Sequence, residues 1–104
     1  MAFTLTGAQE VELVRLCQQF AVRELKLFGS AVTEAFDPAR SDLDFLVTFG
    51  APSEGMLPHR QYFDFLYALE ALFDRKVDLL EESAIENRRF KRAALREAVA
   101  LYAA

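Results

Sequence analysis

Residues 42–49, "DLDFLVTF", constrain the fold more than any other stretch, because they alternate in the way that a half-buried β-strand does. One face of this strand is expected to carry Asp42, Asp44, Leu46 and Thr48, and the opposite face Leu43, Phe45, Val47 and Phe49. The Cα atoms of Asp42 and Asp44 should lie roughly 6–7 Å apart, at a rise of about 3.3 Å per residue. Aspartate is a poor strand former and is costly beside a core, so packing alone does not explain this pair.

Helices and strands are predicted to alternate along the rest of the chain. The apolar periodicity predicts a helix from Thr6 to about residue 21, a strand in "RELKLFG", a short helical segment from Ser30, a helix over 58–73, a strand in "RKVDLLE", and a basic amphipathic helix from about Arg88 to the end. Capping boxes are expected at Thr6 with Gln9 and at Ser83 with Glu86. This order predicts an α/β (α+β) fold, a small mixed sheet of about three strands flanked by helices.

Composition narrows the class of protein further. The chain has 104 residues, which predicts one domain over 1–104, and its net charge of −4 argues against a free nucleic-acid binder. The single cysteine, Cys17, cannot form an intrachain disulfide and is expected in the core, which fits the cytoplasm. No signal peptide or membrane-spanning stretch is expected. Ten phenylalanines and three tyrosines predict either an exposed partner surface or a Phe-rich core.

A third carboxylate, Asp78, lies within the predicted strand "RKVDLLE". If this strand neighbours the first, Asp42, Asp44 and Asp78 converge, and a hard divalent cation, Mg²⁺ or Mn²⁺, would relieve their repulsion. Two such ions could hold the attacking and leaving oxygens of a phosphoryl displacement, with Asp78 accepting a proton. The competing interpretation is structural: Asp44 caps a loop, and Asp78 pairs with Lys76 or Arg75.

The Gly29-Ser30 pair adds weight to the metal–nucleotide interpretation. It follows a predicted strand and opens a predicted helical turn, so it could offer backbone N–H groups and a hydroxyl to a phosphate. A Gly-Ser pair alone carries little information. Its order relative to the three aspartates, and the strands predicted around it, make the combination specific.

The set "LFGS…SDLDFLV…KVDLL", with the basic closing stretch "NRRFKRAALREAVALY", resembles the minimal nucleotidyltransferases of the DNA polymerase beta superfamily. The resemblance covers most of the chain. These are small prokaryotic proteins, often encoded beside a HEPN-domain partner as a toxin–antitoxin pair. The resemblance implies a polymerase-beta-like nucleotidyltransferase fold and the role of antitoxin in a type VII-like toxin–antitoxin pair.

The resemblance also implies a role for each matching residue. Gly29 and Ser30 would bind the triphosphate of an incoming nucleotide. Asp42, Asp44 and Asp78 would ligate one or two Mg²⁺ ions, with Asp78 also acting as the base. The implied reaction transfers AMP from ATP to a hydroxyl, a tyrosine of the HEPN toxin, and releases pyrophosphate. The toxin is an RNase that this modification silences.

One stretch departs from the family pattern. Family members often continue from Gly-Ser into a small, basic stretch, whereas this chain continues with "AVTEAF" and places Glu34 there. Arg40 is the cation expected to compensate as a nucleotide-binding residue. Two alternatives therefore stand beside the enzyme: a catalytically weak or inactive antitoxin that acts by binding alone, and a nucleotidyltransferase that modifies a small molecule.

Overall fold

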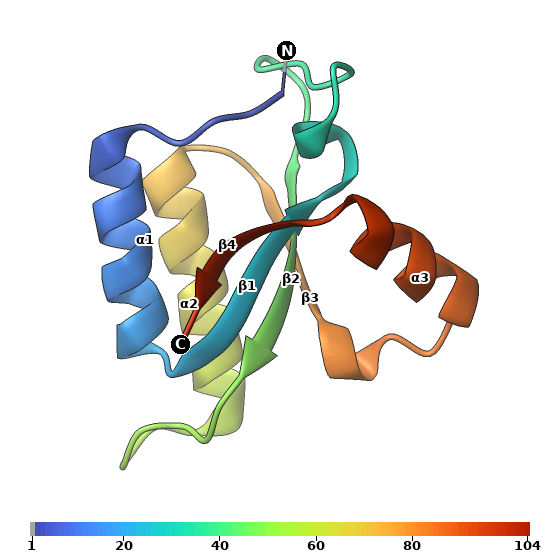
Figure 1. Cartoon of the computed structure of the whole chain (residues 1–104). Helices are drawn as coiled ribbons and strands as arrows, with labels where there is room; N and C mark the ends of the chain where they lie inside the picture. Colours follow the sequence, from blue (N-terminus) through green and yellow to red (C-terminus); the bar gives the residue numbers. More distant parts are fainter. Residues whose placement is uncertain (1) are drawn as a thin grey trace.

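A four-stranded sheet forms the centre of the protein in a computed structural model that describes residues 2–104 (Figure 1). Its strands are β1 (Val22–Phe28), β2 (Leu43–Phe49), β3 (Val77–Glu81) and β4 (Val99–Ala103). They lie in the order β3-β2-β1-β4. Strand β1 runs antiparallel to β2 and β4, whereas β2 and β3 are parallel. The mixed sheet confirms the predicted fold class and places β3 at a free edge.

Three helices cover the two faces of the sheet unequally. They are α1 (Gly7–Gln19), α2 (Pro58–Phe73) and α3 (Arg88–Glu97), accompanied by the 3₁₀ turns η1 (Gly29–Val32) and η2 (Glu82–Ala84). Figure 1 shows α1 and α2 side by side on one face and the shorter α3 on the other. Helix α2 is the crossover that the parallel β2–β3 pair needs.

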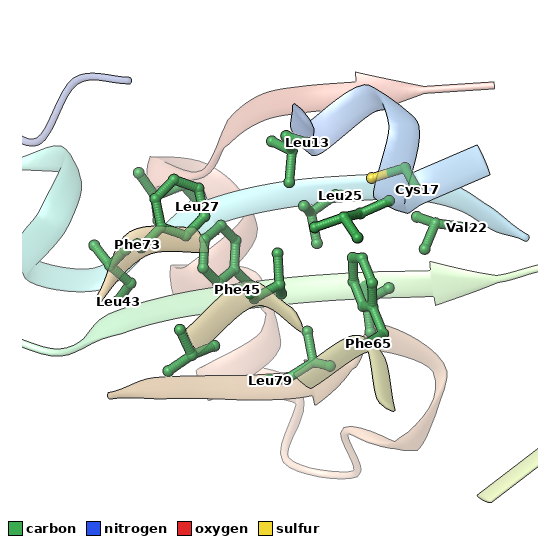
Figure 2. Packing of buried hydrophobic residues seen from close by; sticks show 14 of the residues in the cluster. Leu13, Cys17, Val22, Leu25, Leu27, Leu43, Phe45, Phe65, Phe73 and Leu79 are labelled. Atoms are coloured by element: carbon green, nitrogen blue, oxygen red, sulfur yellow. The ribbon is translucent and has the colours of Figure 1, made fainter. Parts of the chain in front are cut away.

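The main hydrophobic core lies between the sheet and helices α1 and α2 (Figure 2). Leu43, Phe45 and Val47 of β2 are fully buried there, as their alternation predicts. Leu46 instead points to the other face and packs with Phe28 and Ala94 of α3 in a second, smaller cluster. The alternation of residues 42–49 is therefore confirmed, and it separates a core face from a face that carries Asp44.

Cys17 lies in the main core, as predicted, and is completely buried. Burial raises the pKa of its thiol to about 12. At neutral pH the thiol is therefore protonated and unreactive, because only the thiolate is a good nucleophile.

The predicted capping box at the start of α1 is confirmed. Thr6 Oγ1 accepts a hydrogen bond from the Gln9 N–H at 3.1 Å, and Gln9 Oε1 accepts one from the Thr6 N–H at 3.0 Å. The helix ends at Gln19, shortly before the predicted end, because Ala21 adopts a positive φ of 55° and turns the chain into β1. The short helical segment expected from Ser30 is the single 3₁₀ turn η1.

The predicted helix from Arg88 to the chain end is wrong in its last part. Helix α3 is basic but ends at Glu97, and Val99–Ala103 form β4 on the edge of β1, with Leu25 opposite Tyr102. Pairing with an open strand edge overrides the helical periodicity of these apolar residues. The sheet therefore has four strands instead of about three.

The predicted capping box at Ser83 and Glu86 is also wrong. Ser83 lies in η2, and Asn87 caps α3, its Oδ1 accepting from the Phe90 N–H at 3.0 Å. Asparagine is as good an N-cap as serine, so Asn87 caps the helix in place of Ser83, and α3 starts at Arg88 as predicted. Within residues 2–104, none of the helices has the length and apolar character needed to cross a membrane.

Candidate active site

Asp44 and Asp78 lie side by side on the sheet face that α3 partly covers. They are register partners in the parallel pair of β2 and β3, so their side chains project to the same side. The two carboxyl groups are close enough to share a hydrogen bond. Two residues separated by 34 positions in the sequence are therefore brought together because α2 returns the chain beside β2.

The pKa of Asp44 is raised to about 6, first by burial, then by the charge of Asp78 and its hydrogen bond, and finally by the charge of Asp42. Each cause disfavours the ionised carboxylate. A divalent cation would reverse the effect, because its charge compensates both the lost hydration and the repulsion. The raised pKa of Asp44 therefore shows that burial and negative charge act on this carboxyl group without compensation from a nearby cation among residues 2–104.

Gly29 lies directly against Asp44 at the end of β1. Phe28 is the register partner of Asp44, and Gly29 follows it with a positive φ of 74°. A Cβ at Gly29 would overlap Oδ2 of Asp44. Both the backbone conformation and the space therefore require glycine, and the chain can turn into η1 without displacing the carboxylate.

Ser30 is half-buried within η1, next to this contact. Its carbonyl oxygen accepts from the Thr33 N–H at 3.0 Å and from Thr33 Oγ1 at 2.9 Å, which closes the turn. The structure thus brings Gly29 and Ser30 to the carboxylate pair, as the spacing predicts. Their role in binding phosphate stays a prediction.

Asp42 lies immediately before β2, close enough to raise the pKa of Asp44 through its charge. Its Oδ2 is 3.9 Å from Nζ of Lys76, whose side chain is 70% exposed. Such an exposed pair contributes little to stability and leaves the carboxylate accessible. Asp42 therefore lies beside the pair with an accessible carboxylate.

The structural interpretation of Asp78 does not hold. Lys76 pairs with Asp42, and Arg75 Nη1 donates to the Ser41 carbonyl at 3.2 Å. The Arg75 guanidinium lies over the aromatic rings of Phe3 and Phe36, at 5.7 and 5.2 Å from their centroids. Neither cation pairs with Asp78, which is exposed beside Asp44.

Arg40 is exposed in the loop between η1 and β2, where its N–H donates to the Asp37 carbonyl at 3.1 Å. Its role as a nucleotide-binding residue stays a prediction. Across residues 2–104, no cluster of three or more Asp, Glu, His or Cys side chains is arranged as a finished cation site. Asp44 and Asp78, with Asp42 nearby, nevertheless have the oxygen donors and the unmet charge that suit a hard cation.

The sequence did not predict the apolar wall of this site. The Phe90 ring of α3 packs edge-on against Phe28, with centroids 6.1 Å apart, so α3 borders the carboxylates. Next to it a hollow of about 470 Å³ follows the free edge of β3 and is lined by Leu80, Ile85 and Phe90 among others. The only signal in the sequence was an aromatic residue within a strongly basic helix.

Comparison with known proteins places this geometry in a family. The model of the nucleotidyltransferase domain matches residues 13–101, which include all three aspartates and the Gly-Ser turn. The chain therefore belongs to the nucleotidyltransferase domain family. A search of curated proteins finds no match to the sequence.

Solved structures agree with the family assignment. A protein assigned as a minimal nucleotidyltransferase shares 29% identity, with a TM-score of 0.69 and coverage of 88% of both chains. A toxin–antitoxin structure with AMP-PNP has 18% identity and a TM-score of 0.66, covering 91% of this chain and 73% of the other. A complex of a tri-AMPylated Shewanella oneidensis HEPN toxin with its MNT antitoxin has 16% identity and a TM-score of 0.61, covering 93% and 71%. The two latter likenesses establish the fold alone.

Proposed function

We propose that this protein is a Mg²⁺-dependent nucleotidyltransferase that transfers AMP from ATP to a hydroxyl, a tyrosine, of a HEPN-domain toxin, and so acts as its antitoxin. The observation that carries the proposal is the pair Asp44 and Asp78, held side by side against the Gly29 turn. Two proteins of the same fold support it: one is a complex of an MNT antitoxin with a tri-AMPylated HEPN toxin, and the other is a toxin–antitoxin structure with AMP-PNP.

The reaction is a displacement at the α-phosphorus of ATP. The acceptor oxygen forms a new bond to that phosphorus, the bond to the bridging oxygen of the β-phosphate breaks, and pyrophosphate leaves with the electron pair. Asp78 accepts the proton of the attacking hydroxyl, for which it is well placed as the more exposed carboxylate of the pair. The N–H groups and hydroxyl of Gly29 and Ser30 hold the β- and γ-phosphates, and Arg40 adds a positive charge from the neighbouring loop.

Asp42, Asp44 and Asp78 would hold the cation. When bound, Mg²⁺ supplies positive charge to the phosphate oxygens and to the attacking and leaving oxygens. The raised pKa of Asp44 fits this role, because a carboxylate crowded by two others gains most from a cation. Mn²⁺ has similar ligand preferences and is expected to substitute.

A second candidate is an antitoxin that neutralises its partner by binding alone. Exposed aromatic side chains favour this hypothesis, since Phe63 and Tyr67 of α2 are 45% and 59% exposed and stack on one another. Such a patch could hold a partner whether or not transfer occurs. In both candidates the protein is a single domain over 1–104 with the nucleotidyltransferase fold. In both it forms a hetero-oligomer with its partner in the cytoplasm.

Label transfer tests the proposal. A HEPN-domain protein is incubated with α-labelled ATP, Mg²⁺ and either the wild type or Asp44→Asn. Label should pass to the HEPN protein with the wild type and fall on the order of 10³-fold with Asp44→Asn. Asp74→Asn is the matched control, because Asp74 is an exposed aspartate at the end of α2 in a left-handed conformation that asparagine tolerates. Toxin neutralisation that persists in Asp44→Asn without transfer would favour the binding-only candidate.

A further inference from the structure

The hollow along the free edge of β3 is a feature that the proposed chemistry does not use. It measures about 470 Å³, enough for an aromatic side chain with its neighbours. Its apolar wall consists of Leu80, Ile85 and Phe90, and two carboxylates, Glu81 and Glu86, also line it. Leu80 and Phe90 are 37% and 43% exposed, so the hollow presents two large apolar side chains to solvent.

This hollow begins next to the carboxylate pair. Leu80 follows Asp78 by two residues in β3, so the two side chains share a face at a spacing of roughly 6–7 Å. On the other side, Phe90 contacts Phe28, the register partner of Asp44. A group seated against Phe90 and Leu80 could therefore reach the space above Asp44 and Asp78.

The direction of the reaction determines what enters from this side. In a phosphoryl displacement the attacking and leaving oxygens lie roughly in line, on opposite sides of the phosphorus. With the terminal phosphates at Gly29 and Ser30, the pyrophosphate leaves on the β1 side of Asp44. The strand order β3-β2-β1 then puts the attacking hydroxyl on the β3 side, where the hollow lies.

The negative charge at the hollow also indicates which kind of ligand it can bind. Glu81 and Glu86 are exposed there, and the nearby Tyr62 hydroxyl is already engaged with the Leu79 carbonyl. The pKa of Tyr62 is raised first by burial and then by the charges of Glu81 and Asp78, so the charge of Glu81 acts at this place. An acidic rim disfavours a nucleotide and favours an apolar ring flanked by positive charges.

We propose that this hollow, lined by Leu80, Ile85 and Phe90, is the acceptor subsite, and that it seats the tyrosine ring of a partner segment whose neighbouring residues are basic. The inference rests on the proposed function, since it assigns the acceptor of that same reaction. Phe90 and Leu80 contact the ring, whereas Glu81 and Glu86 select the flanking charges.

Binding is tested first, apart from catalysis. The probe is a short peptide with one tyrosine between two lysines, compared with a twin in which both lysines are glutamates. Titration of the isotope-labelled full chain should shift the methyl resonances of Leu80 and Ile85 with the lysine peptide, and at least about tenfold more weakly with its twin. Unshifted methyls with the lysine peptide, or equal affinity for the twins, would overturn the assignment.

A substitution that fills the hollow sharpens the test. Ala84 is exposed and lines the hollow, so Ala84→Phe should abolish the peptide-induced shifts. Ala93→Phe is the matched control, since Ala93 is exposed on α3 and does not line the hollow. Both variants are expected to keep the wild-type fold by amide spectra, because each adds a ring at an exposed position. Peptide binding that survives Ala84→Phe would contradict the assignment.

Steady-state kinetics then test whether the hollow binds the acceptor protein or the nucleotide. Phe90→Ala should raise the KM for the HEPN protein about tenfold or more and leave the KM for ATP unchanged. A raised KM for ATP instead would assign the hollow to the nucleobase and overturn the inference. Label transfer without methyl shifts removes the acceptor subsite but leaves the proposed function standing. Methyl shifts without transfer to any acceptor remove the proposed function and the acceptor role with it, and leave the hollow only as a binding site for a tyrosine with basic neighbours.

Discussion

The two faces of the sheet differ in what covers them. Helices α1 and α2 bury most of one face, where Leu25 and Phe45 of the sheet and Phe65 of α2 are at 0% exposure. The opposite face is covered only in part by the short α3, whose buried contact consists of Ala94 on Phe28 and Leu46. Asp44 and Asp78 project from the second face.

This difference shows how a small domain accommodates costly groups. The stability comes mainly from the first face, where apolar burial is continuous. The second face can then keep carboxylates close together and an apolar hollow open, because the fold does not depend on filling them. Single substitutions should therefore change stability on one face and activity on the other.

The largest effect on stability is expected at Phe65, which is completely buried in the main core. Phe65→Ala removes a ring that contacts Phe20 and Phe49, and should lower the free energy of unfolding by about 3–5 kcal/mol. Urea denaturation measures the change. Phe90→Ala on the other face should cost much less, because that side chain is 43% exposed. Equal losses for the two variants would remove the contrast between the faces.

Gly29→Ala should affect both stability and activity. The positive φ costs roughly 1–2 kcal/mol with alanine, and the new Cβ must also push away the carboxylate of Asp44. A displaced reacting group can reduce the rate of transfer about 100-fold. Gly55→Ala is a close control, because Gly55 has a similar φ of 83° with open space around its Cβ position. Thermal unfolding should shift in both variants, but label transfer should fall only in Gly29→Ala.

The pH dependence of stability should reveal the carboxylate pair in the metal-free protein. The pKa of Asp44 is raised from 3.8 to about 6, so the folded state holds this proton more tightly than the unfolded chain. The stability that protonated Asp44 adds to the folded state is therefore fully present below about pH 3.8, and it is lost as the pH rises through 6. Asp44→Asn should flatten this loss in thermal unfolding between pH 4 and 7, whereas Asp74→Asn should not. An unchanged slope in Asp44→Asn would show that Asp44 is not the crowded group.

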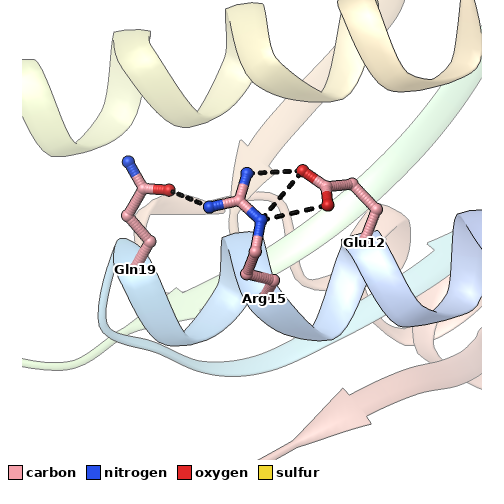
Figure 3. A network of polar contacts seen from close by, with 3 residues as sticks. All are labelled: Glu12, Arg15 and Gln19. Atoms are coloured by element: carbon pink, nitrogen blue, oxygen red, sulfur yellow. Dashed lines mark hydrogen bonds and ion pairs between the residues drawn. The ribbon is translucent and has the colours of Figure 1, made fainter.

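The smallest effect is expected on the outer surface of α1. Arg15 donates to Glu12 and Gln19 on the same helix, as Figure 3 shows, and all of these contacts are exposed. Exposed pairs within one helix are screened by water and salt. Arg15→Ala should therefore leave the melting temperature nearly unchanged and transfer at the wild-type level. A clear loss of stability would mean that the core face depends on more than apolar burial.

The sequence predicted where most residues of the candidate site lie, because their geometry is local to strands. Alternation placed Asp44 opposite Phe45, and the apolar run around Asp78 identified the second strand, so only their adjacency had to be assumed. Strand β4 was missed because its pairing with β1 is a contact between distant segments, and its apolar residues also fit a helix. The hollow beside Phe90 was missed for a similar reason, since it depends on where α3 packs.

The most direct test of the central claim is the intact mass of the HEPN protein after co-expression. The claim is that Asp44 and Asp78 form the catalytic centre of a nucleotidyltransferase that modifies this partner. The wild type and Asp74→Asn should yield a partner whose mass has increased by one or more AMP groups, whereas Asp44→Asn and Asp78→Asn should yield an unmodified partner. Equal modification by all four proteins would contradict the account.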